Sequence, residues 1–231
     1  MNETESLKAL EEKIGYVFSD RELLKRALTH SSYANELQVG SKEDYERYEF
    51  LGDAVLELTV SDYLFRKNKG MKEGEMTKIR ASYVCEPTLA ICARSINLQE
   101  HMLLGKGEEA QGSRNRDSII SDVFEAVIGA IYLDGGLSQA KQFIKRFVLK
   151  DIDKKRLFFD SKTQLQTITQ RAGQELRYEV VGEEGPDHDK SYTVEVIIDG
   201  KGVARGKGSS KKHAQQSAAY EALLILNEKE E

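Results

Sequence analysis

The chain has 231 residues, of which 39% are hydrophobic and 32% are charged, and its formal net charge at pH 7 is −5. This composition is typical of a soluble protein with one large or two small domains, and the negative net charge argues against binding of nucleic acid through bulk positive charge. The apolar runs are too short to cross a bilayer and no signal peptide is visible, so we expect no membrane partner.

The cysteines and histidines are too few and too scattered for the usual zinc sites. Cys85 and Cys92 do not form a Cys-x-x-Cys pair, and the four histidines lie far apart in the sequence. So few cysteines are typical of a reducing compartment, and we therefore expect a cytoplasmic protein. The chain also has no Gly-x-Ser-x-Gly turn, which argues against a serine hydrolase.

Residues 8 to 150 predict one helix after another. Ser19 and Asp20 precede a helical segment, and Pro87 stands where a first helical turn tolerates proline. The segment YERYEFLGDAVLELTVSDYLF predicts a helix whose carboxylates fall within an arc of roughly 80°. These carboxylates, and the apolar side chains expected beside them, are Glu46, Glu49, Asp53 and Glu57, and Phe50, Leu51, Ala54, Val55 and Leu58. This helix alone fits a solvated acidic face as well as it fits a metal site.

A second helix carries acids where they are costly. From Ile119 to Leu133 the chain is apolar all round the helical wheel except for Asp122 and Glu125. Buried carboxylates three residues apart repel each other, so a basic group from elsewhere or a metal ion must meet them. Packed against the first acidic helix, they would form an all-oxygen site suited to Mg²⁺ or Mn²⁺. The Asp134-Gly135-Gly136 segment predicts the end of this helix.

The residue pattern changes after the charged segment 150–160, which predicts a join between two domains. We place an all-α domain at 1–152, a linker at 153–159 and a second domain at 160–231. The second domain is expected to begin with a helix at 161–172, with Leu165 and Ile168 facing inward. Strands are expected at 178–181, 192–198 and 202–206, with a hairpin turn at Asp199-Gly200.

A final helix, capped by Ser209 or Ser210, completes the order α-β-β-β-α. This order predicts a three-stranded antiparallel sheet with both helices on one face. Between Asp199 and Glu221 the chain has five basic residues and no acid, a local patch suited to phosphate, namely Lys201, Arg205, Lys207, Lys211 and Lys212.

Several motifs resemble one known family. ERYEFLGDAVL is similar to the signature of bacterial ribonuclease III, and so are HSSYANE at 30–36 and the segment 106–136. The C-terminal unit resembles a double-stranded RNA-binding domain through its GPDH turn and its SKKxA helix start. The resemblance covers nearly the whole chain and implies an all-α endonuclease domain followed by an α-β-β-β-α double-stranded RNA-binding domain.

The resemblance also implies roles for individual residues. The metal ligands would be Glu49, Asp53, Asp122 and Glu125, of which Asp53 and Glu125 are also catalytic. Glu46 and Glu73 would be accessory acids, unless they are only solvated or helix-terminal. Phe50 would pack across a homodimer interface, unless it is buried within one subunit.

The remaining roles concern RNA. The resemblance assigns RNA contacts to Gln166, Gln170, His188, Lys211 and Lys212. A-form RNA is recognised mainly through shape, 2′-hydroxyls and phosphates. The two lysines at a helix start would clamp a phosphate, and the competing interpretation is a solvated face.

The implied activity is Mg²⁺-dependent hydrolysis of double-stranded RNA by metal-activated water, with no organic cofactor. Such hydrolysis gives 5′-phosphate and 3′-hydroxyl ends, and the family resemblance adds short 3′ overhangs and processing of ribosomal RNA precursors. Two alternatives are a non-catalytic RNA binder, which loss of a metal-site carboxylate would favour, and a helical metal hydrolase acting on nucleotides. All four carboxylates are present, and the chain lacks a His-Asp metal pair.

Overall fold

The computed structural model describes the chain apart from residues 1, 38–43, 186–189, 209 and 228–231. The chain forms two compact units, residues 1–152 and 153–231, and each is treated by itself below. Among the described residues, no helix is long and apolar enough to cross a membrane.

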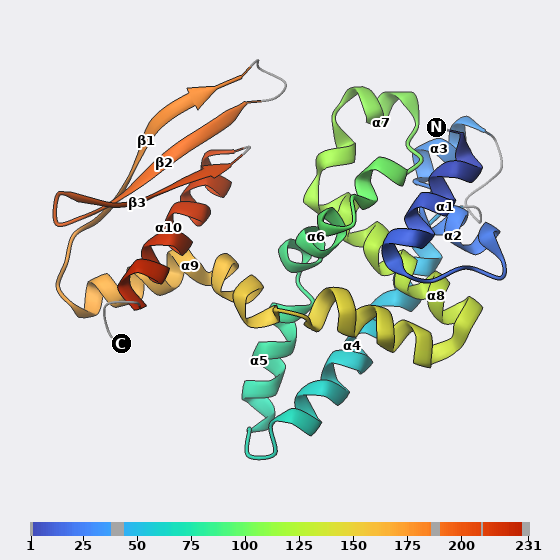
Figure 1. Cartoon of the computed structure of the whole chain (residues 1–231), viewed down its shortest axis with the longest axis horizontal. Coiled ribbons are helices and arrows are strands. Elements are labelled where there is room, and N and C mark those ends of the chain that lie inside the picture. Colours follow the sequence, from blue (N-terminus) through green and yellow to red (C-terminus); the bar gives the residue numbers. More distant parts are fainter. Residues whose placement is uncertain (1, 38–43, 186–189, 209, 228–231) are drawn as a thin grey trace. The chain divides into compact units, whose positions relative to one another are not determined.

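The first unit is helical, as the sequence predicts (Figure 1). Asp20 accepts a hydrogen bond from the backbone of Glu22 and so caps the second helix, and Pro87 lies in the first turn of the sixth. The elements are α1 (Glu3–Ile14), α2 (Arg21–Ala27), α3 (Ser31–Glu36), α4 (Glu46–Lys67), α5 (Glu73–Tyr83), α6 (Glu86–Ser95), η1 (Leu98–His101), α7 (Lys106–Ala110), η2 (Ser113–Asn115), α8 (Asp117–Ile144) and η3 (Lys145–Leu149).

The centre of this unit is α8, which packs against α2, α4 and α6. Its apolar side chains from Val123 to Ile131 are fully buried, which confirms that this helix is enclosed on most sides. The predicted end of the buried helix at Asp134-Gly135-Gly136 is confirmed, and a second helical segment follows it within α8. Gly136 has a φ of 75° and a ψ of 179°, a conformation that side chains other than glycine rarely adopt, and helix resumes beyond it to Ile144.

The apolar side chains expected beside the acids of α4 are only partly buried. Val55 is buried, but Phe50 is 82% exposed and Leu58 is 55% exposed. The face that meets the core is formed by Tyr48, Gly52, Val55, Leu56, Thr59, Val60 and Leu64. The helical wheel identifies an apolar face beside the acids but does not tell which residues meet α8, because α4 has apolar side chains on two sides.

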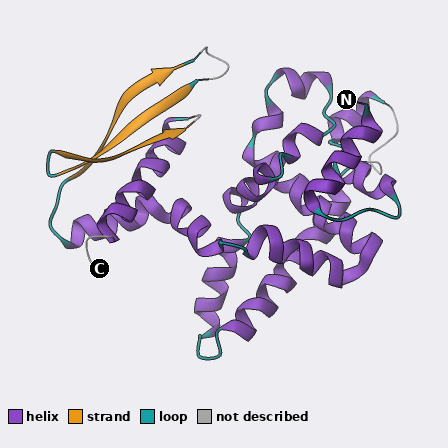
Figure 2. Cartoon of the chain, in the orientation of Figure 1, coloured by secondary structure: helices purple, strands orange, loops and turns teal. Residues whose placement is uncertain are grey.

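The second unit contains the three strands of the chain's sheet (Figure 2). Its elements are α9 (Ile152–Arg171), β1 (Leu176–Glu184), β2 (Ser191–Ile198), β3 (Lys201–Gly208) and α10 (Lys211–Asn227). The sheet is antiparallel in the order β1-β2-β3, and Asp199 and Gly200 both have positive φ in the β2–β3 turn. The predicted strands and their hairpin are therefore confirmed, with each outer strand extending a few residues further.

Both helices of this unit cover the same face of the sheet. Leu165 of α9 is buried in one core with Val194 and Val196 of β2 and with Ala214 and Ala218 of α10. Ile168, which was expected to face inward, is 41% exposed. Thr169, one helical turn after Leu165, is buried instead, and its hydroxyl group donates a hydrogen bond to the carbonyl of Leu165.

The segment predicted as a linker, 153–159, is helical in the structure. It lies in α9, which begins at Ile152 and continues through Arg171. The sequence prediction relied on charge in this segment, and charged residues such as Lys and Arg are also good helix formers.

Candidate metal centre

The two acidic helices approach each other unusually closely, through a pair of glycines. A Cβ atom at Gly52 of α4 would lie 1.8 Å from the carbonyl oxygen of Glu125, and one at Gly129 of α8 would lie 2.2 Å from that of Tyr48. Each glycine thus faces the backbone of the other helix, in space that no other residue type fits. The close approach brings the carboxylates of α4 next to those of α8.

Three carboxylates meet at this crossing. Glu49, Asp122 and Glu125 are all half-buried, and each offers one oxygen within 4.8 Å of the others. Glu49 comes from the first turn of α4, while Asp122 and Glu125 lie one turn apart on α8. The structure therefore brings together three of the four acids that the resemblance assigned to a metal.

The electrostatics of this cluster fit a site that holds a cation. Burial raises the pKa of Glu125 to about 8, and the charges of Asp53, Glu49, Asp122 and Glu57 add to the effect. Burial also raises the pKa of Glu49 to about 7, again with contributions from neighbouring carboxylates. Such raised pKa values mean that the ionised cluster is unfavourable by itself and that a divalent cation would stabilise it.

Asp53 lies at the edge of this cluster. It follows Glu49 by one turn of α4, is exposed, and does not belong to the group within 4.8 Å. Partial burial of its carboxylate and the charge of Glu57 raise its pKa. Its own charge raises the pKa of both Glu49 and Glu125, which places it in their electrostatic neighbourhood.

The two accessory acids differ in position. Glu46 is exposed in the first turn of α4, and its charge raises the pKa of Glu49. Glu73 is exposed at the start of α5 and accepts a hydrogen bond from the hydroxyl of Thr77 at 2.9 Å. Glu73 lines a groove between α4 and α5 together with Phe65 and Arg80, apart from the three clustered carboxylates.

Sequence reasoning missed two neighbours of Asp122. Burial and the charge of Glu86, at the start of α6, raise the pKa of Asp122. Tyr45, the residue directly before α4, is 6% exposed, and its side chain opposes that rise in the pKa of Asp122. The position of Tyr45 beside the acidic signature was the only available signal, and an aromatic there is equally compatible with core packing.

The remaining predicted residues lie on surfaces. Phe50 is exposed on α4, so it is not buried within its own subunit. Gln166 and Gln170 are exposed one turn apart on α9, and Lys211 and Lys212 are exposed at the start of α10. Ser210 accepts a hydrogen bond from the backbone of His213 at 3.2 Å, as expected of a cap. His188 lies outside the described residues.

The donor set of the centre is suited to a hard divalent cation. All its ligand atoms are carboxylate oxygens, which Mg²⁺ and Mn²⁺ accept and which softer metals do not favour. Mg²⁺ commonly uses one or two carboxylates and fills its other positions with water or phosphate oxygens. The residues present therefore fit a divalent cation that also contacts a phosphate.

A helical unit with an acidic, oxygen-only centre, joined to an α-β-β-β-α unit, defines a class of two-domain proteins. Similarity to known protein families identifies the family within this class. Residues 20–152 match the family model described as Ribonuclease-III-like, and residues 161–226 match the double-stranded RNA binding motif. The chain belongs to the ribonuclease III family. This membership, with its double-stranded RNA-binding unit, supports endoribonuclease activity on double-stranded RNA.

Individual relatives agree along the whole chain. Ribonuclease 3 of Listeria monocytogenes serotype 4a (strain HCC23) is 48% identical over 229 residues, which are 98% of this chain and 99% of that protein. Ribonuclease 3 of Bacillus cereus (strain G9842) is 48% identical over 97% of this chain and 93% of its own length. Among solved structures, the nuclease domain of ribonuclease III from Campylobacter jejuni is 42% identical, with a TM-score of 0.58, and covers 62% of this chain and 96% of its own.

Proposed function

We propose that this protein is a cytoplasmic, Mg²⁺-dependent endoribonuclease that hydrolyses phosphodiester bonds in double-stranded RNA, with Mn²⁺ able to substitute for Mg²⁺. The observation that carries the proposal is the convergence of Glu49, Asp122 and Glu125 within 4.8 Å in a chain that also has an RNA-binding unit. Structured transcripts, including ribosomal RNA precursors, are the proposed substrates.

The proposed chemistry divides the work among the acids. When bound, a divalent cation would lower the pKa of a water molecule that it binds and neutralise charge on phosphate oxygens. Glu49, Asp122 and Glu125 would hold that cation. Asp53, exposed beside them, completes the proposed set of four metal-site carboxylates and is, with Glu125, a proposed catalytic residue. Attack by water rather than by the 2′-hydroxyl leaves 5′-phosphate and 3′-hydroxyl ends.

Substrate binding is assigned to the second unit. Gln166 and Gln170 present amide groups from one exposed face of α9, suited to 2′-hydroxyls in the minor groove. Lys211 and Lys212 stand at the first turn of α10, where free backbone N–H groups also favour a phosphate. The Lys211 ammonium lies 5.7 Å from the centre of the Tyr192 ring, which limits its freedom before RNA arrives.

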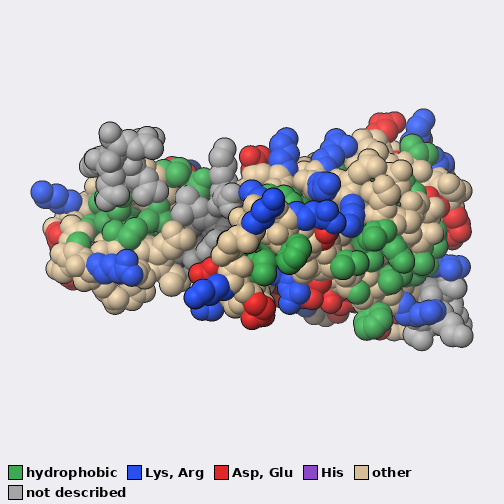
Figure 3. All heavy atoms as spheres, turned by 90° about the horizontal axis from the view of Figure 1, so that it is seen from below, with side chains coloured by type: hydrophobic (Ala, Val, Ile, Leu, Met, Phe, Trp, Pro, Cys, Tyr) green, Lys and Arg blue, Asp and Glu red, His purple; other side chains and the backbone are tan. Residues whose placement is uncertain are grey.

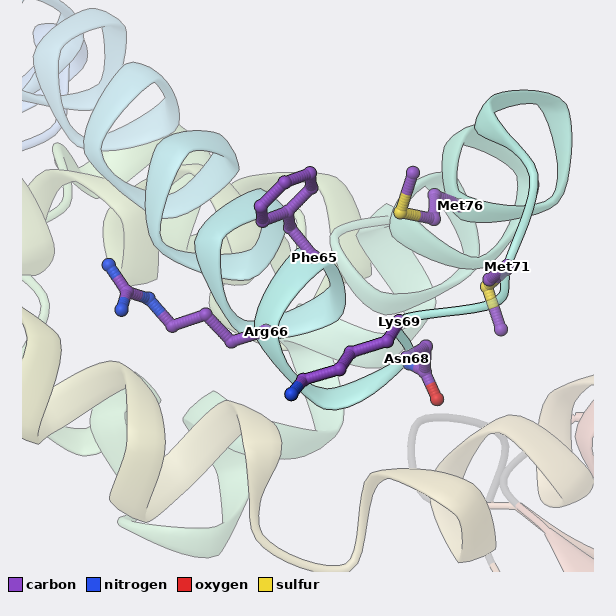
Figure 4. Close-up of a pocket in the computed structure, with 6 residues that line it drawn as sticks. All are labelled: Phe65, Arg66, Asn68, Lys69, Met71 and Met76. Carbon is purple, nitrogen blue, oxygen red and sulfur yellow. The ribbon is translucent and has the colours of Figure 1, made fainter.

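We also propose that the active form is a homodimer, and the exposed side of α4 supports it. Phe50, Leu58 and Phe65 are 82%, 55% and 71% exposed, and all lie on one side of this helix. Phe65 also borders a groove that it shares with Met71 and Met76 (Figure 4). On the face in Figure 3, hydrophobic side chains of the first unit lie among Lys and Arg side chains.

An apolar surface of this kind, next to the acidic centre, is typical of protein–protein contacts. The Campylobacter jejuni nuclease domain is described as having a region involved in dimer formation. Two copies joined along α4 would place two acidic centres near one duplex, so that each strand is cut and short 3′ overhangs result.

The test is cleavage of an end-labelled RNA duplex by the full chain, with Mg²⁺ or with a chelator, and with the matching single strand as control. We expect Mg²⁺-dependent cutting of the duplex alone, and products that a 5′-phosphate-dependent exonuclease degrades. Binding of the duplex without cleavage under any divalent cation would favour the non-catalytic RNA binder instead. Sedimentation of the parent and of Phe50→Asp tests the dimer, which the charge should dissociate.

A further inference from the structure

We propose that Lys162 is a positioning residue of the RNA-binding unit, which fixes the spacing between the RNA-contact groups of α9 and those of α10. These groups are the amides of Gln166 and Gln170 and the ammonium groups of Lys211 and Lys212. The inference rests on the proposed function, because it assumes that both sets contact duplex RNA. It assigns to Lys162 a task other than contact with RNA.

Lys162 links α9 to α10 through a hydrogen bond between side chains. Its Nζ donates to Oε1 of Gln215 on α10 at 2.7 Å, and both residues are half-buried. Because an ammonium group has only donors, the amide oxygen of Gln215 is the atom that accepts. A hydrogen bond with a charged donor is shorter and stronger than one between neutral groups. This contact therefore holds the two helices together at one defined point.

The same ammonium group also contacts the sheet. Nζ of Lys162 lies 5.0 Å from the centre of the Tyr178 ring on β1. The face of an aromatic ring attracts a cation, and Tyr178 itself packs against the core of this unit. Lys162 is thus restrained by α10 and by β1 at once, and its charge has partners within the unit.

The bridge lies one helical turn from each set of RNA-contact groups. Gln166 follows Lys162 by four residues on α9, and Gln215 follows Lys211 by four residues on α10. Side chains four residues apart lie on the same side of a helix. A movement of α9 against α10 at the bridge therefore changes the distance between the amides and the lysines.

Of the two helices, α9 is the one whose position the bridge determines, because α10 is already fixed on the sheet. A Cβ atom at Gly206 of β3 would lie 2.1 Å from the backbone nitrogen of Ala218, and one at Gly208 would lie 2.5 Å from that of Ala214. Such close contact leaves α10 no freedom to move toward the strand. Leu165 of α9 is buried in the same core, but the three residues that follow it are exposed.

Duplex RNA requires this spacing because its grooves and phosphates recur at fixed distances. The A-form helix is recognised through shape, 2′-hydroxyls and phosphates. Contact groups already held at the matching spacing need not be ordered when RNA binds. A charge-assisted hydrogen bond and a cation–π contact together are worth on the order of tenfold in an equilibrium constant. We therefore expect loss of the bridge to weaken duplex binding about five- to tenfold.

The competing interpretation is that Lys162 contacts a phosphate directly, and the salt dependence of binding distinguishes the two. Each phosphate contact releases counterions and so contributes to the slope of log affinity against log salt. Loss of a phosphate contact makes that slope shallower. Loss of a positioning residue lowers the affinity at every salt concentration and leaves the slope unchanged.

The experiment measures duplex binding by the full chain without divalent cation, so that no cleavage occurs. The RNA duplex is longer than the about 16 base pairs that one such domain spans. Lys162→Met keeps the length of the side chain but removes the ammonium group, and Gln215→Met removes only the acceptor. Lys162→Arg keeps a cation that can donate to the amide and stack on the ring.

Arg177→Met is the matched control, because it also removes one positive charge from the same unit. Arg177 is exposed one residue before Tyr178 on β1, and successive side chains of a strand point to opposite faces. Its Nε lies 3.4 Å from a carboxylate oxygen of Glu175. The control thus removes a cation from the face of the sheet away from the bridge.

We expect Lys162→Met to raise the Kd about five- to tenfold and Gln215→Met to raise it several-fold, both with the parental salt slope. The double variant should bind no more weakly than Lys162→Met, because both changes break one bridge. Lys162→Arg and Arg177→Met should bind like the parent. In cleavage with Mg²⁺, the KM of Lys162→Met should rise while kcat at saturating duplex is kept.

A parental Kd in Lys162→Met, a shallower salt slope, losses that add in the double variant, or an equal loss in Arg177→Met overturns the inference. Circular dichroism checks that each variant is folded. If Lys162→Met does not fold, Gln215→Met decides, because it keeps the charge and the ring contact, and a parental Kd in that variant overturns the inference. A parent protein that binds no duplex refutes the proposed RNA-binding role of the unit, which is a distinguishable result.

Discussion

Replacing Gly129 by alanine is expected to separate the two helices that carry the acidic centre. The added Cβ would lie 2.2 Å from the carbonyl oxygen of Tyr48, whereas ordinary contact begins at 3.4 Å, so the backbones must part by about 1.2 Å. Inserting a methyl group into such a tight contact costs about 1–3 kcal/mol of the free energy of unfolding. Because Glu49 lies one residue after Tyr48, the same displacement moves it from Asp122 and Glu125.

A shift of about 1 Å in a catalytic arrangement commonly reduces the rate on the order of 100-fold. Urea unfolding, the Mn²⁺ Kd and the rate of duplex cleavage measure the three effects. Gly74→Ala is the control, because a Cβ at Gly74 of α5 meets nothing within 4 Å, and alanine stabilises a helix by about 0.5–1 kcal/mol over glycine. If Gly129→Ala keeps the parental Mn²⁺ affinity and cleavage rate, the close approach does not position the centre.

Three further outcomes are expected. Glu125→Gln should reduce cleavage more than tenfold at saturating Mg²⁺ while duplex binding is kept, measured by single-turnover cleavage and by filter binding, because only a ligand charge is lost. Lys211→Ala with Lys212→Ala should weaken all duplexes alike and make the slope of log affinity against log salt shallower, whereas an unchanged slope means that these lysines hold no phosphates. The folded-state pKa values of Glu49 and Glu125, about 7 and about 8, exceed the ordinary 4.5, so the metal-free protein should lose stability as pH rises from about 5 to 8. Its Mg²⁺ affinity should rise over the same range, because the ionised carboxylates bind the cation. Thermal unfolding with and without Mg²⁺ measures both effects, and a pH-independent effect of the metal would contradict these pKa values.

The sequence predicted the acidic centre because its signals are local. Asp122 and Glu125 stand out as the only charges in a segment that is apolar all round, and their cost of burial requires a positive partner. The strands and final helix of the second unit followed from alternation at β2 and from the Asp199-Gly200 turn. Such patterns involve residues that lie close together along the chain, so they can be recognised from the sequence alone.

What the sequence did not predict depends on contacts between distant segments. Tyr45 affects the pKa of Asp122 although the two lie far apart in the sequence, and its backbone N–H donates to the carbonyl of Thr29. The inner face of α4 is determined by how its glycine fits against α8, and a helical wheel contains no information about that partner. For the same reason the wheel did not distinguish Ile168 from Thr169 as the inner residue of α9.

The most direct test of the account is to locate the cation. Crystals of the full chain soaked in Mn²⁺ can be measured at the manganese absorption edge, where the metal alone gives a strong anomalous signal. The account predicts an anomalous peak bounded by the carboxylates of Glu49, Asp122 and Glu125, and its loss in Glu125→Gln. A well-ordered site with no peak there, or a peak only at other acids, would contradict the central claim.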